Sequence, residues 1–304
     1  MVFVQLISSQ SKMNQPSTFF LSGEATDPGY LHVRDGQQWG EAKAFTEALW
    51  ETYRPFADPN FLTDARNHFL QRFWEMYLAC ALIRRGFEVR RAGHEGPELY
   101  FLCEGRRIWV EAIAPDSGTG ADRVPEIQPG QRYTVPTEKI LLRYTNALVV
   151  KHQQYEAAVA KGIIQPGEQI VLAINSRGIP HAPYGAEMPY IVKALLPFGA
   201  LTYLVDTKTK KITDSFHQHR SQLLKTNTAP VATTWFLDPR FAHFVAVLNS
   251  SVDCANRPHE LGEEFLVLHN PKASPSLPKD LFSWCRQLEF YDETLQKVPR
   301  HTEG

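Results

Sequence analysis

"GPELYFLCEGRRIWVEAIAP", residues 96–115, has the pattern of two short strands joined by a tight turn. The Glu104-Gly105 pair between the two runs suits a two-residue turn, because glycine readily adopts the positive φ angles that such turns need. A turn at these two residues places Cys103 opposite Arg106. The stretch therefore predicts a β-hairpin whose register follows by counting outward from the turn.

The same register sets two glutamates face to face near the open end of the hairpin. Counting outward puts Glu98 opposite Glu111, with Tyr100 and Trp109 on the same face. A four-residue loop preserves this pairing, whereas a three-residue loop does not. Directly opposed side chains have Cβ atoms about 4.5–5.5 Å apart, and like charges at that distance destabilise the strand pair. Some other group is therefore expected to compensate the two carboxylates.

A divalent cation would provide this compensation, since Mg²⁺ is held by one or two carboxylates together with water and phosphate oxygens. We therefore expect Glu98 and Glu111 to bind Mg²⁺ or Mn²⁺. Without the cation, removal of Glu111 is expected to raise the melting temperature slightly, because it relieves repulsion. The alternative is that both glutamates are solvated on an exposed strand, although the aromatic neighbours favour a partly covered face.

The segments around the hairpin predict a mixed α/β sheet with helices on its faces. Helical spacing of apolar residues runs through 39–53 and again from Asp64 to Gly86, and a long helix is expected over about 137–161. The run "QIVLAIN", residues 169–175, is continuously apolar, as expected for a strand that is buried on both faces. The order helix, strand, hairpin, helix, strand is typical of an α/β fold.

The chain is expected to form one α/β domain over 39–304, preceded by a loose tail at 1–38. Its second half predicts a hairpin at 200–214 and strands at 241–249 and 263–270. With 304 residues and a formal net charge of −1, the chain lacks the global positive charge of many nucleic-acid-binding proteins. The four cysteines form no CxxC pair, the opening residues have too short an apolar run and no basic segment for a signal peptide to be expected, and no 18-residue apolar run follows. We therefore expect a cytoplasmic protein without a membrane partner.

These features together resemble the PD-(D/E)XK nuclease superfamily. Pro97-Glu98 stands where that family has "PD", and Glu111-Ala112-Ile113 stands where it has "(D/E)xK". The preceding helix offers Glu75 as the family's helical acidic residue. The resemblance covers about residues 64–176 and implies a restriction-endonuclease-like αβββαβ core, with 177–304 as a C-terminal elaboration. It also implies a metal-dependent nuclease in which the three glutamates are catalytic.

The sequence departs from the family pattern at two positions. Glu98 replaces the usual aspartate, and Ile113 replaces the lysine. Because some members of the family carry this lysine on a neighbouring helix, we searched the long helix for a cation that would face the sheet. Lys151 lies on the apolar stripe of that helix, three residues after Leu148 and four before Tyr155. It is the candidate to replace the missing lysine, unless its stem packs on the core and its ammonium extends to water.

Further candidate residues lie near this site. Gln71 shares one helix edge with Glu75, and Gln154 lies one turn from Lys151, so both glutamines are expected to support the catalytic residues. Arginines are frequent between positions 66 and 107, and such a cluster suits contacts with a phosphate backbone, although a solvated charged face is the commoner explanation. The arginines expected to contact nucleic acid are Arg84, Arg85, Arg106 and Arg107. The "HxH" pair His217 and His219 lacks a third ligand and is weak evidence for a metal site.

The expected function is hydrolysis of phosphodiester bonds in DNA, or in RNA, by metal-activated water. Glu98 and Glu111 would bind the metal, Glu75 would support a second ion or its water, and Lys151 would stabilise developing negative charge. A second class, a nucleic-acid-binding or regulatory protein that has lost cleavage, is favoured by Ile113. A third class is a glycosidase, because retaining enzymes place two carboxyl groups about 5–5.5 Å apart. Formation of a homodimer is left open.

Overall fold

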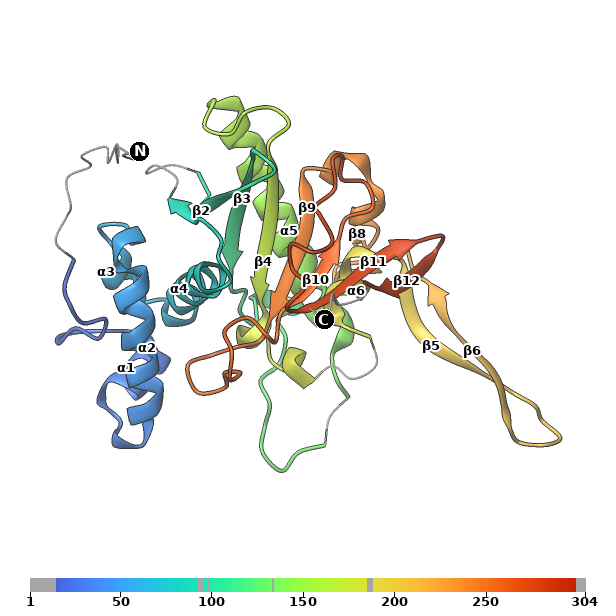
Figure 1. The fold of residues 1–304 in the computed structure, drawn as a ribbon. Coiled ribbons are helices and arrows are strands. Elements are labelled where there is room, and N and C mark those ends of the chain that lie inside the picture. The colour runs from blue at the N-terminus through green and yellow to red at the C-terminus, as the bar shows by residue number, and fades with distance from the viewer. Residues whose placement is uncertain (1–14, 92–95, 98, 133, 185–187, 299–304) are drawn as a thin grey trace.

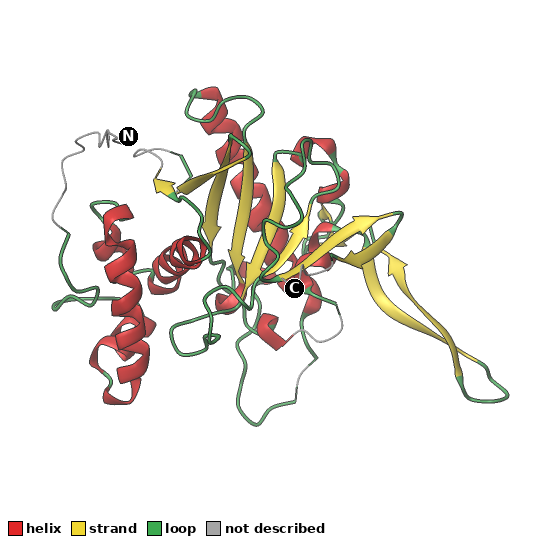
Figure 2. Ribbon diagram, in the orientation of Figure 1, coloured by secondary structure: helices red, strands yellow, loops and turns green. Residues whose placement is uncertain are grey.

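The computed structural model describes residues 15–91, 96–97, 99–132, 134–184 and 188–298. A mixed sheet runs through the middle of the molecule, with helices on both of its faces (Figures 1 and 2). Its eight strands, in spatial order, are β1 (Arg90–Arg91), β2 (Leu99–Cys103), β3 (Arg106–Ile113), β4 (Gln169–Asn175), β9 (Phe244–Ser250), β10 (Leu266–His269), β11 (Arg286–Tyr291) and β12 (Thr294–Lys297). The expected mixed α/β sheet with flanking helices is therefore confirmed.

The remaining described elements are helices and two small two-stranded sheets. The helices are α1 (Pro28–Asp35), α2 (Gly40–Tyr53), α3 (Phe61–Ala65), α4 (Phe69–Arg84), α5 (Thr137–Ala160) and α6 (Tyr190–Leu195). The small sheets pair β5 (Phe198–Val205) with β6 (Ile212–His219) and β7 (Gln222–Leu224) with β8 (Pro230–Ala232). Figure 1 shows that β5 and β6 project away from the rest of the molecule.

The elements follow one another as expected from the sequence, in the order α4, β1, β2, β3, α5, β4. β2 and β3 are antiparallel and form the hairpin, whereas β3 and β4 are parallel. A parallel pair needs a crossover connection, because the chain must return to the same end of the sheet before the second strand begins. The loop after β3 and the long helix α5 make this connection.

Each face of the sheet has its own helix and its own apolar core. Val110 and Ala112 of β3 point to the α4 side, where Trp74 is fully buried and its Nε1 donates a hydrogen bond to the Ala173 carbonyl oxygen at 3.0 Å. Trp109 points to the α5 side and belongs to the core formed by α5 and α6. Because side chains alternate along a strand, Glu111 shares the α5 side with Trp109.

The predicted tail at 1–38 is wrong for residues 15–38. Phe19 and Tyr30 are fully buried, and Phe19 packs against Trp50 with ring centroids 6.0 Å apart. The Glu47 carboxylate accepts backbone hydrogen bonds from Phe19 at 2.7 Å and from Phe20 at 3.1 Å. Phe19 and Phe20 thus anchor residues 15–38 to α2, although the polar residues around them predicted a tail without fixed structure. Residues 1–14 lie outside the described part of the chain.

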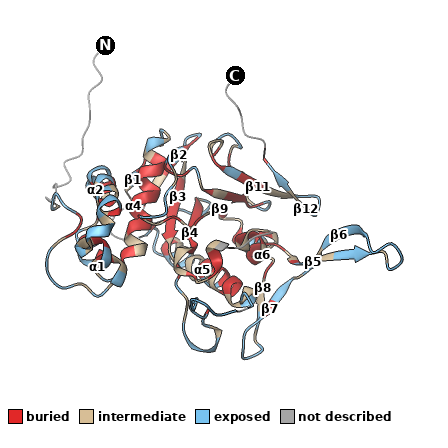
Figure 3. Ribbon diagram, turned by 90° about the horizontal axis from the view of Figure 1, so that it is seen from below, coloured by how far each residue is buried: buried red, intermediate tan, exposed pale blue. Residues whose placement is uncertain are grey.

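The second half of the chain contributes to the same sheet as the first. β9 lies directly beside β4 and parallel to it, and β10, β11 and β12 continue the sheet outward. Figure 3 shows β3, β4 and β9 as buried elements and the β5–β6 hairpin as mostly exposed. The segment expected to elaborate a core over 64–176 therefore supplies four of the eight strands in the described sheet.

Candidate active site at the β2–β3 hairpin and α5

The turn of the β2–β3 hairpin has the geometry expected from the sequence. Glu104 and Gly105 have φ angles of 51° and 77°, which is the positive region required at both central residues of a type I′ turn. The register runs from Cys103 opposite Arg106 to Leu99 opposite Val110. Both observations confirm the predicted pairing over the described part of β2.

Glu98, one residue before β2, lies outside the described residues, so its position opposite Glu111 stays a prediction. Tyr100 and Trp109 face each other as expected, with ring centroids 5.3 Å apart and an angle of 63° between the ring planes. Trp109 belongs to the buried core on the α5 side of the sheet, and Tyr100 is partly buried against that core. This face of the hairpin is therefore partly buried, as its aromatic residues indicated.

Glu111 forms an ion pair with Lys151 of α5. The Lys151 ammonium contacts Glu111 Oε1, and each side chain is only 12% exposed. Tyr144 and Leu148 hold the same helix stripe against the sheet, since both are buried in the α5 core. The predicted orientation of Lys151 toward the sheet is thus confirmed, and the alternative of an ammonium extended into water is wrong. Its catalytic role stays a prediction.

The Glu111–Lys151 pair lines a cavity of about 400 Å³ between β3 and the second half of α5. Gln154, predicted to support the site, also lines this cavity, and so does Lys161. The sequence analysis missed Lys161, although its position just after the end of α5, nearly three helical turns beyond Lys151, was a usable signal. Gly96 closes one side of the cavity, where an added Cβ would lie 2.8 Å from Ile163 Cγ2.

Glu75, predicted to be catalytic, is not among the described residues that line the cavity. It lies on α4, which packs on the opposite face of β3 from Glu111. Its carboxylate accepts hydrogen bonds from Gln71 Nε2 at 2.8 Å and from Arg72 Nη1 at 2.7 Å. Burial opposes the charge on Arg72, but Glu75, Asp58 and Asp64 together raise the pKa of its guanidinium. Glu75 is thus held in a structural ion-pair network that its helical spacing did not reveal.

Gln71 is likewise committed to the backbone at the end of β3. Its Oε1 accepts a hydrogen bond from the Ala114 amide at 2.7 Å, and its Nε2 donates to the Ala112 carbonyl at 3.2 Å. The side chain therefore fixes the path of the chain just beyond Glu111. It supports the candidate site through the backbone rather than through contact with the cavity.

The four arginines expected to bind nucleic acid make different contacts. Arg84 is exposed, whereas the Arg85 guanidinium lies 5.0 Å from the centroid of the Trp284 ring. Arg106 bonds to Glu104 and Gln169 at 3.2 and 3.1 Å. The Arg107 guanidinium stacks over Tyr100 and Trp109, at 4.8 and 5.1 Å from their centroids, and lies 3.4 Å from a carboxylate oxygen of Glu168. Three of the four are therefore engaged within the protein.

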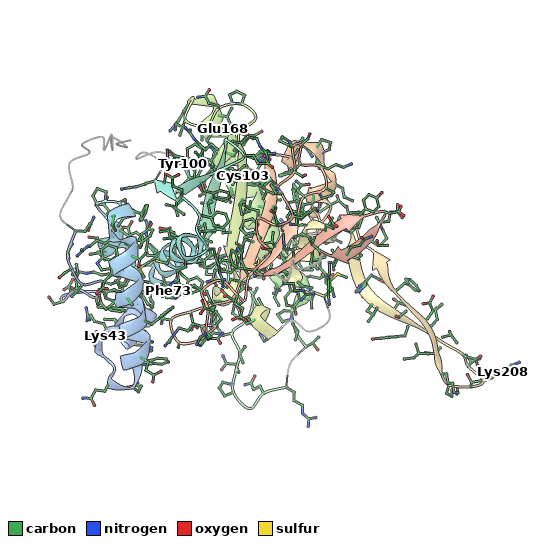
Figure 4. All side chains as sticks on the ribbon, viewed as in Figure 1. Lys43, Phe73, Tyr100, Cys103, Glu168 and Lys208 are labelled. Carbon is green, nitrogen blue, oxygen red and sulfur yellow. The ribbon has the colours of Figure 1, made fainter. Side chains whose placement is uncertain are left out.

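Glu168 organises the rim of the cavity, and the sequence analysis did not identify it. Its Oε2 accepts a hydrogen bond from Trp109 Nε1 at 2.9 Å, and its carbonyl oxygen accepts one from the Tyr155 hydroxyl at 3.0 Å. Figure 4 labels Glu168 and Tyr100 at the same end of the sheet. Because Tyr155 lines the cavity, Glu168 connects the hairpin, α5 and the start of β4.

His243 packs against Tyr155 and forms a close pair with His152. His243 stacks on the Tyr155 ring with centroids 4.0 Å apart, and its Nε2 lies 3.3 Å from His152 Nδ1. Burial, reinforced by the neighbouring His152, lowers the pKa of His243 from 6.5 to about 4. His243 is therefore neutral at pH 7 in the folded protein.

This pKa predicts a loss of stability in acid. The unfolded chain takes up a proton at His243 near pH 6.5, whereas the folded chain resists protonation down to about pH 4, so stability falls across this window. Relative to His243→Gln, we expect the wild type to lose about 3 kcal/mol of unfolding free energy between pH 6.5 and 4. Urea denaturation at several pH values measures this difference. The control His259→Gln replaces a histidine that is 94% exposed and should leave the dependence of unfolding free energy on pH unchanged. If wild type and His243→Gln show the same dependence on pH, the lowered pKa of His243 is wrong.

Apart from the predicted pair of Glu98 and Glu111, the described residues show no candidate metal site. No three His, Cys, Asp or Glu side chains gather there in an arrangement that could hold an ion. His217 lies on β6 with its Nδ1 3.3 Å from the Gly199 carbonyl oxygen, so the "HxH" pattern belongs to the projecting hairpin. The predicted pair of Glu98 and Glu111 is outside this comparison because Glu98 is not described.

Comparisons with known proteins do not assign the chain to a family: no family model, no curated protein and no solved structure matches it. Within the described residues, no helix combines the length and the apolar character that a membrane span requires. Any functional conclusion therefore depends on the cavity and its residues.

Proposed function

We propose that this protein is a metal-dependent phosphodiesterase that acts on nucleic acid, in the first place DNA, through a restriction-endonuclease-like core. The observation that carries the proposal is the contact between the Lys151 ammonium and the Glu111 carboxylate inside an accessible cavity. Ile113 stands where the sequence motif has a lysine. Lys151 of α5 instead brings an ammonium group to Glu111, two residues before Ile113. The element order from α4 to β4 also supports the proposed core.

The donor set suits a divalent cation such as Mg²⁺ or Mn²⁺. Glu111, together with Glu98 as the hairpin register predicts, would supply carboxylate oxygens, which are the ligands that these hard cations prefer. When bound, the cation would act as a Lewis acid toward water and phosphate. Because the Lys151 ammonium contacts the Glu111 carboxylate, we expect it to turn toward a phosphate oxygen when a cation binds that carboxylate.

Other residues of the cavity would position the substrate. Lys161 offers a second positive charge to a phosphate, and the Gln154 amide can donate to a phosphate oxygen. Tyr155 and Ile163, both partly exposed, provide apolar surface for the sugar or base beside it. The cavity thus combines cations for the phosphate backbone with a carboxylate for the metal.

Cleavage assays test the proposal directly. Wild-type protein with Mg²⁺ or Mn²⁺ is expected to cleave at least one of single-stranded DNA, double-stranded DNA and RNA, and chelation with EDTA should abolish cleavage. Gel electrophoresis of labelled oligonucleotides measures the products. Nucleic-acid cleavage that survives EDTA would remove the metal from the proposal. Hydrolysis of an aryl glycoside without metal would replace the proposal with the glycosidase alternative.

A second candidate function is nucleic-acid binding without cleavage. Ile113 leaves the motif position without a cation, and Lys151 pairs with the carboxylate that would otherwise bind metal. If the wild type cleaves none of the three substrates and Ile113→Lys gains cleavage, a lapsed nuclease that retains binding is the better interpretation.

A further inference from the structure

The hairpin formed by β5 and β6, residues 198–219, is a projecting arm whose contacts with the other described residues lie at its base. Figure 1 shows it extending away from the central sheet. At the base, Phe198 packs against Phe290 of β11 with ring centroids 5.8 Å apart. Arg220 Nη2 donates hydrogen bonds to the carbonyl oxygens of Phe198 and Lys193, both at 3.1 Å. The base is therefore rigidly connected to α6 and the sheet.

The outer part of the arm exposes an unusual amount of apolar surface. Five of the ten large hydrophobic residues that are exposed in the described structure lie here, namely Tyr203, Leu204, Val205, Ile212 and Phe216. An isolated two-stranded hairpin is marginally stable in water, and clustered apolar side chains on a protein surface commonly mark a binding site. The arm thus has the features of an element that binds a partner.

The tip of the arm is basic. Lys208, Lys210 and Lys211 lie within five residues, 207–211, that include no acidic side chain, and none of the three has an ion-pair partner in the described structure. Figure 4 labels Lys208 at the far end of the arm. The nearest acidic residue, Asp206, accepts the backbone amides of Lys208 and Thr209 at its Oδ1, at 2.7 and 2.8 Å, and these bonds lower the pKa of its carboxyl, so it stays negatively charged. One negative and three positive side chains therefore leave the exposed tip, residues 206–211, with a net positive charge.

We propose that the arm binds double-stranded nucleic acid, with its lysines on the phosphate backbone and its strands in the major groove. The major groove of DNA admits a two-stranded β-ribbon. Each strand has eight residues and spans about 26 Å at the usual rise, which is long enough to cross the groove. Tyr203 and Phe216 lie on opposite faces of the ribbon, where they can contact base edges and sugars. A polyanion suits the net positive charge of this tip better than an apolar protein surface does.

This inference rests on the proposed action on nucleic acid, and it adds a binding surface outside the cavity. Its test separates binding from cleavage by using EDTA, so that no metal-dependent reaction takes place. Fluorescence anisotropy with a labelled 30-base-pair duplex measures the dissociation constant at several salt concentrations. Lys208→Ala/Lys211→Ala is the test variant, because Lys210 has a φ of 56° and its replacement would also change the turn.

We expect the test variant to bind about tenfold more weakly than the wild type and to reduce the salt slope of log K by about 2, the value for two lost phosphate contacts. The control Lys272→Ala/Lys297→Ala removes two exposed lysines outside the arm and should bind as the wild type does. Equal binding by the test and control variants, or no duplex binding by the wild type, overturns the proposal.

The same variants distinguish this proposal from the proposed enzymatic function. If the wild type binds the duplex through the arm but cleaves no substrate, the binding proposal stands and the proposed nuclease activity is wrong. If the protein cleaves and neither binding nor cleavage changes in the arm variant, the nuclease activity stands and the binding proposal is wrong. Light scattering on Tyr203→Ser/Phe216→Ser tests the other occupant, a second copy of the chain. A wild-type dimer that this variant dissociates, with duplex binding unchanged, would make the arm a dimerisation surface and overturn the proposal.

Discussion

Lys151→Ala is expected to lower the rate of metal-dependent cleavage by a factor of about 100 or more, the usual effect of removing one electrostatic stabiliser of the transition state. The ammonium lies at the one described carboxylate of the cavity, so it is placed to oppose negative charge that develops on a phosphate bound there. Mn²⁺ binding should persist in the variant, because Lys151→Ala leaves Glu111 in position. Single-turnover cleavage and calorimetric titration with Mn²⁺ measure the two effects separately.

Two further variants keep this prediction specific. Lys151→Gln retains most of the side-chain volume, so a loss of activity shared with Lys151→Ala cannot come from a cavity left in the packing. Lys139→Ala removes a lysine from the first turn of the same helix, where its ammonium bonds to the Ala121 carbonyl, and should cleave normally. Full activity in both Lys151 variants would remove this lysine from the mechanism.

The local patterns of the candidate site were readable in the sequence. The Glu104-Gly105 turn set the hairpin register, because a two-residue turn with two positive φ angles leaves one alignment for the residues beside it. The spacing of Lys151 from Leu148 placed it on the helix stripe that faces the sheet. Both predictions depended on a fixed backbone period, and both are confirmed.

Contacts between distant segments were not readable in the same way. Nothing in the period of α4 distinguishes a glutamate that reaches a cavity from one that pairs with Arg72, so the catalytic role predicted for Glu75 depended chiefly on the resemblance. The placement of β9 beside β4 joins strands that are some 70 residues apart, and no local pattern specifies which strands pair. Glu168 reaches the rim only because β4 starts next to Trp109, which again follows from tertiary packing.

Glu111→Ala is expected to abolish Mn²⁺ binding at the cavity and to lower the free energy of unfolding by about 3 kcal/mol, the lower end of the range for breaking a buried ion pair. The stability change has the opposite sign to the slight gain expected from the sequence. Repulsion between opposed glutamates predicted a gain, but the structure adds the Lys151 ammonium, which is only 12% exposed and would lose its contact with the Glu111 carboxylate.

A double-mutant cycle decides between these two signs. Glu111→Ala leaves the Lys151 ammonium partly buried, whereas Glu111→Ala combined with Lys151→Met removes both members of the ion pair and should recover much of the lost stability, since an apolar replacement of a buried ion pair is often neutral. Urea denaturation of the wild type, the two single variants and the double variant measures the coupling. A melting temperature that rises in Glu111→Ala would mean that repulsion from Glu98 dominates the site, and that Lys151 serves the chemistry rather than the stability of the fold.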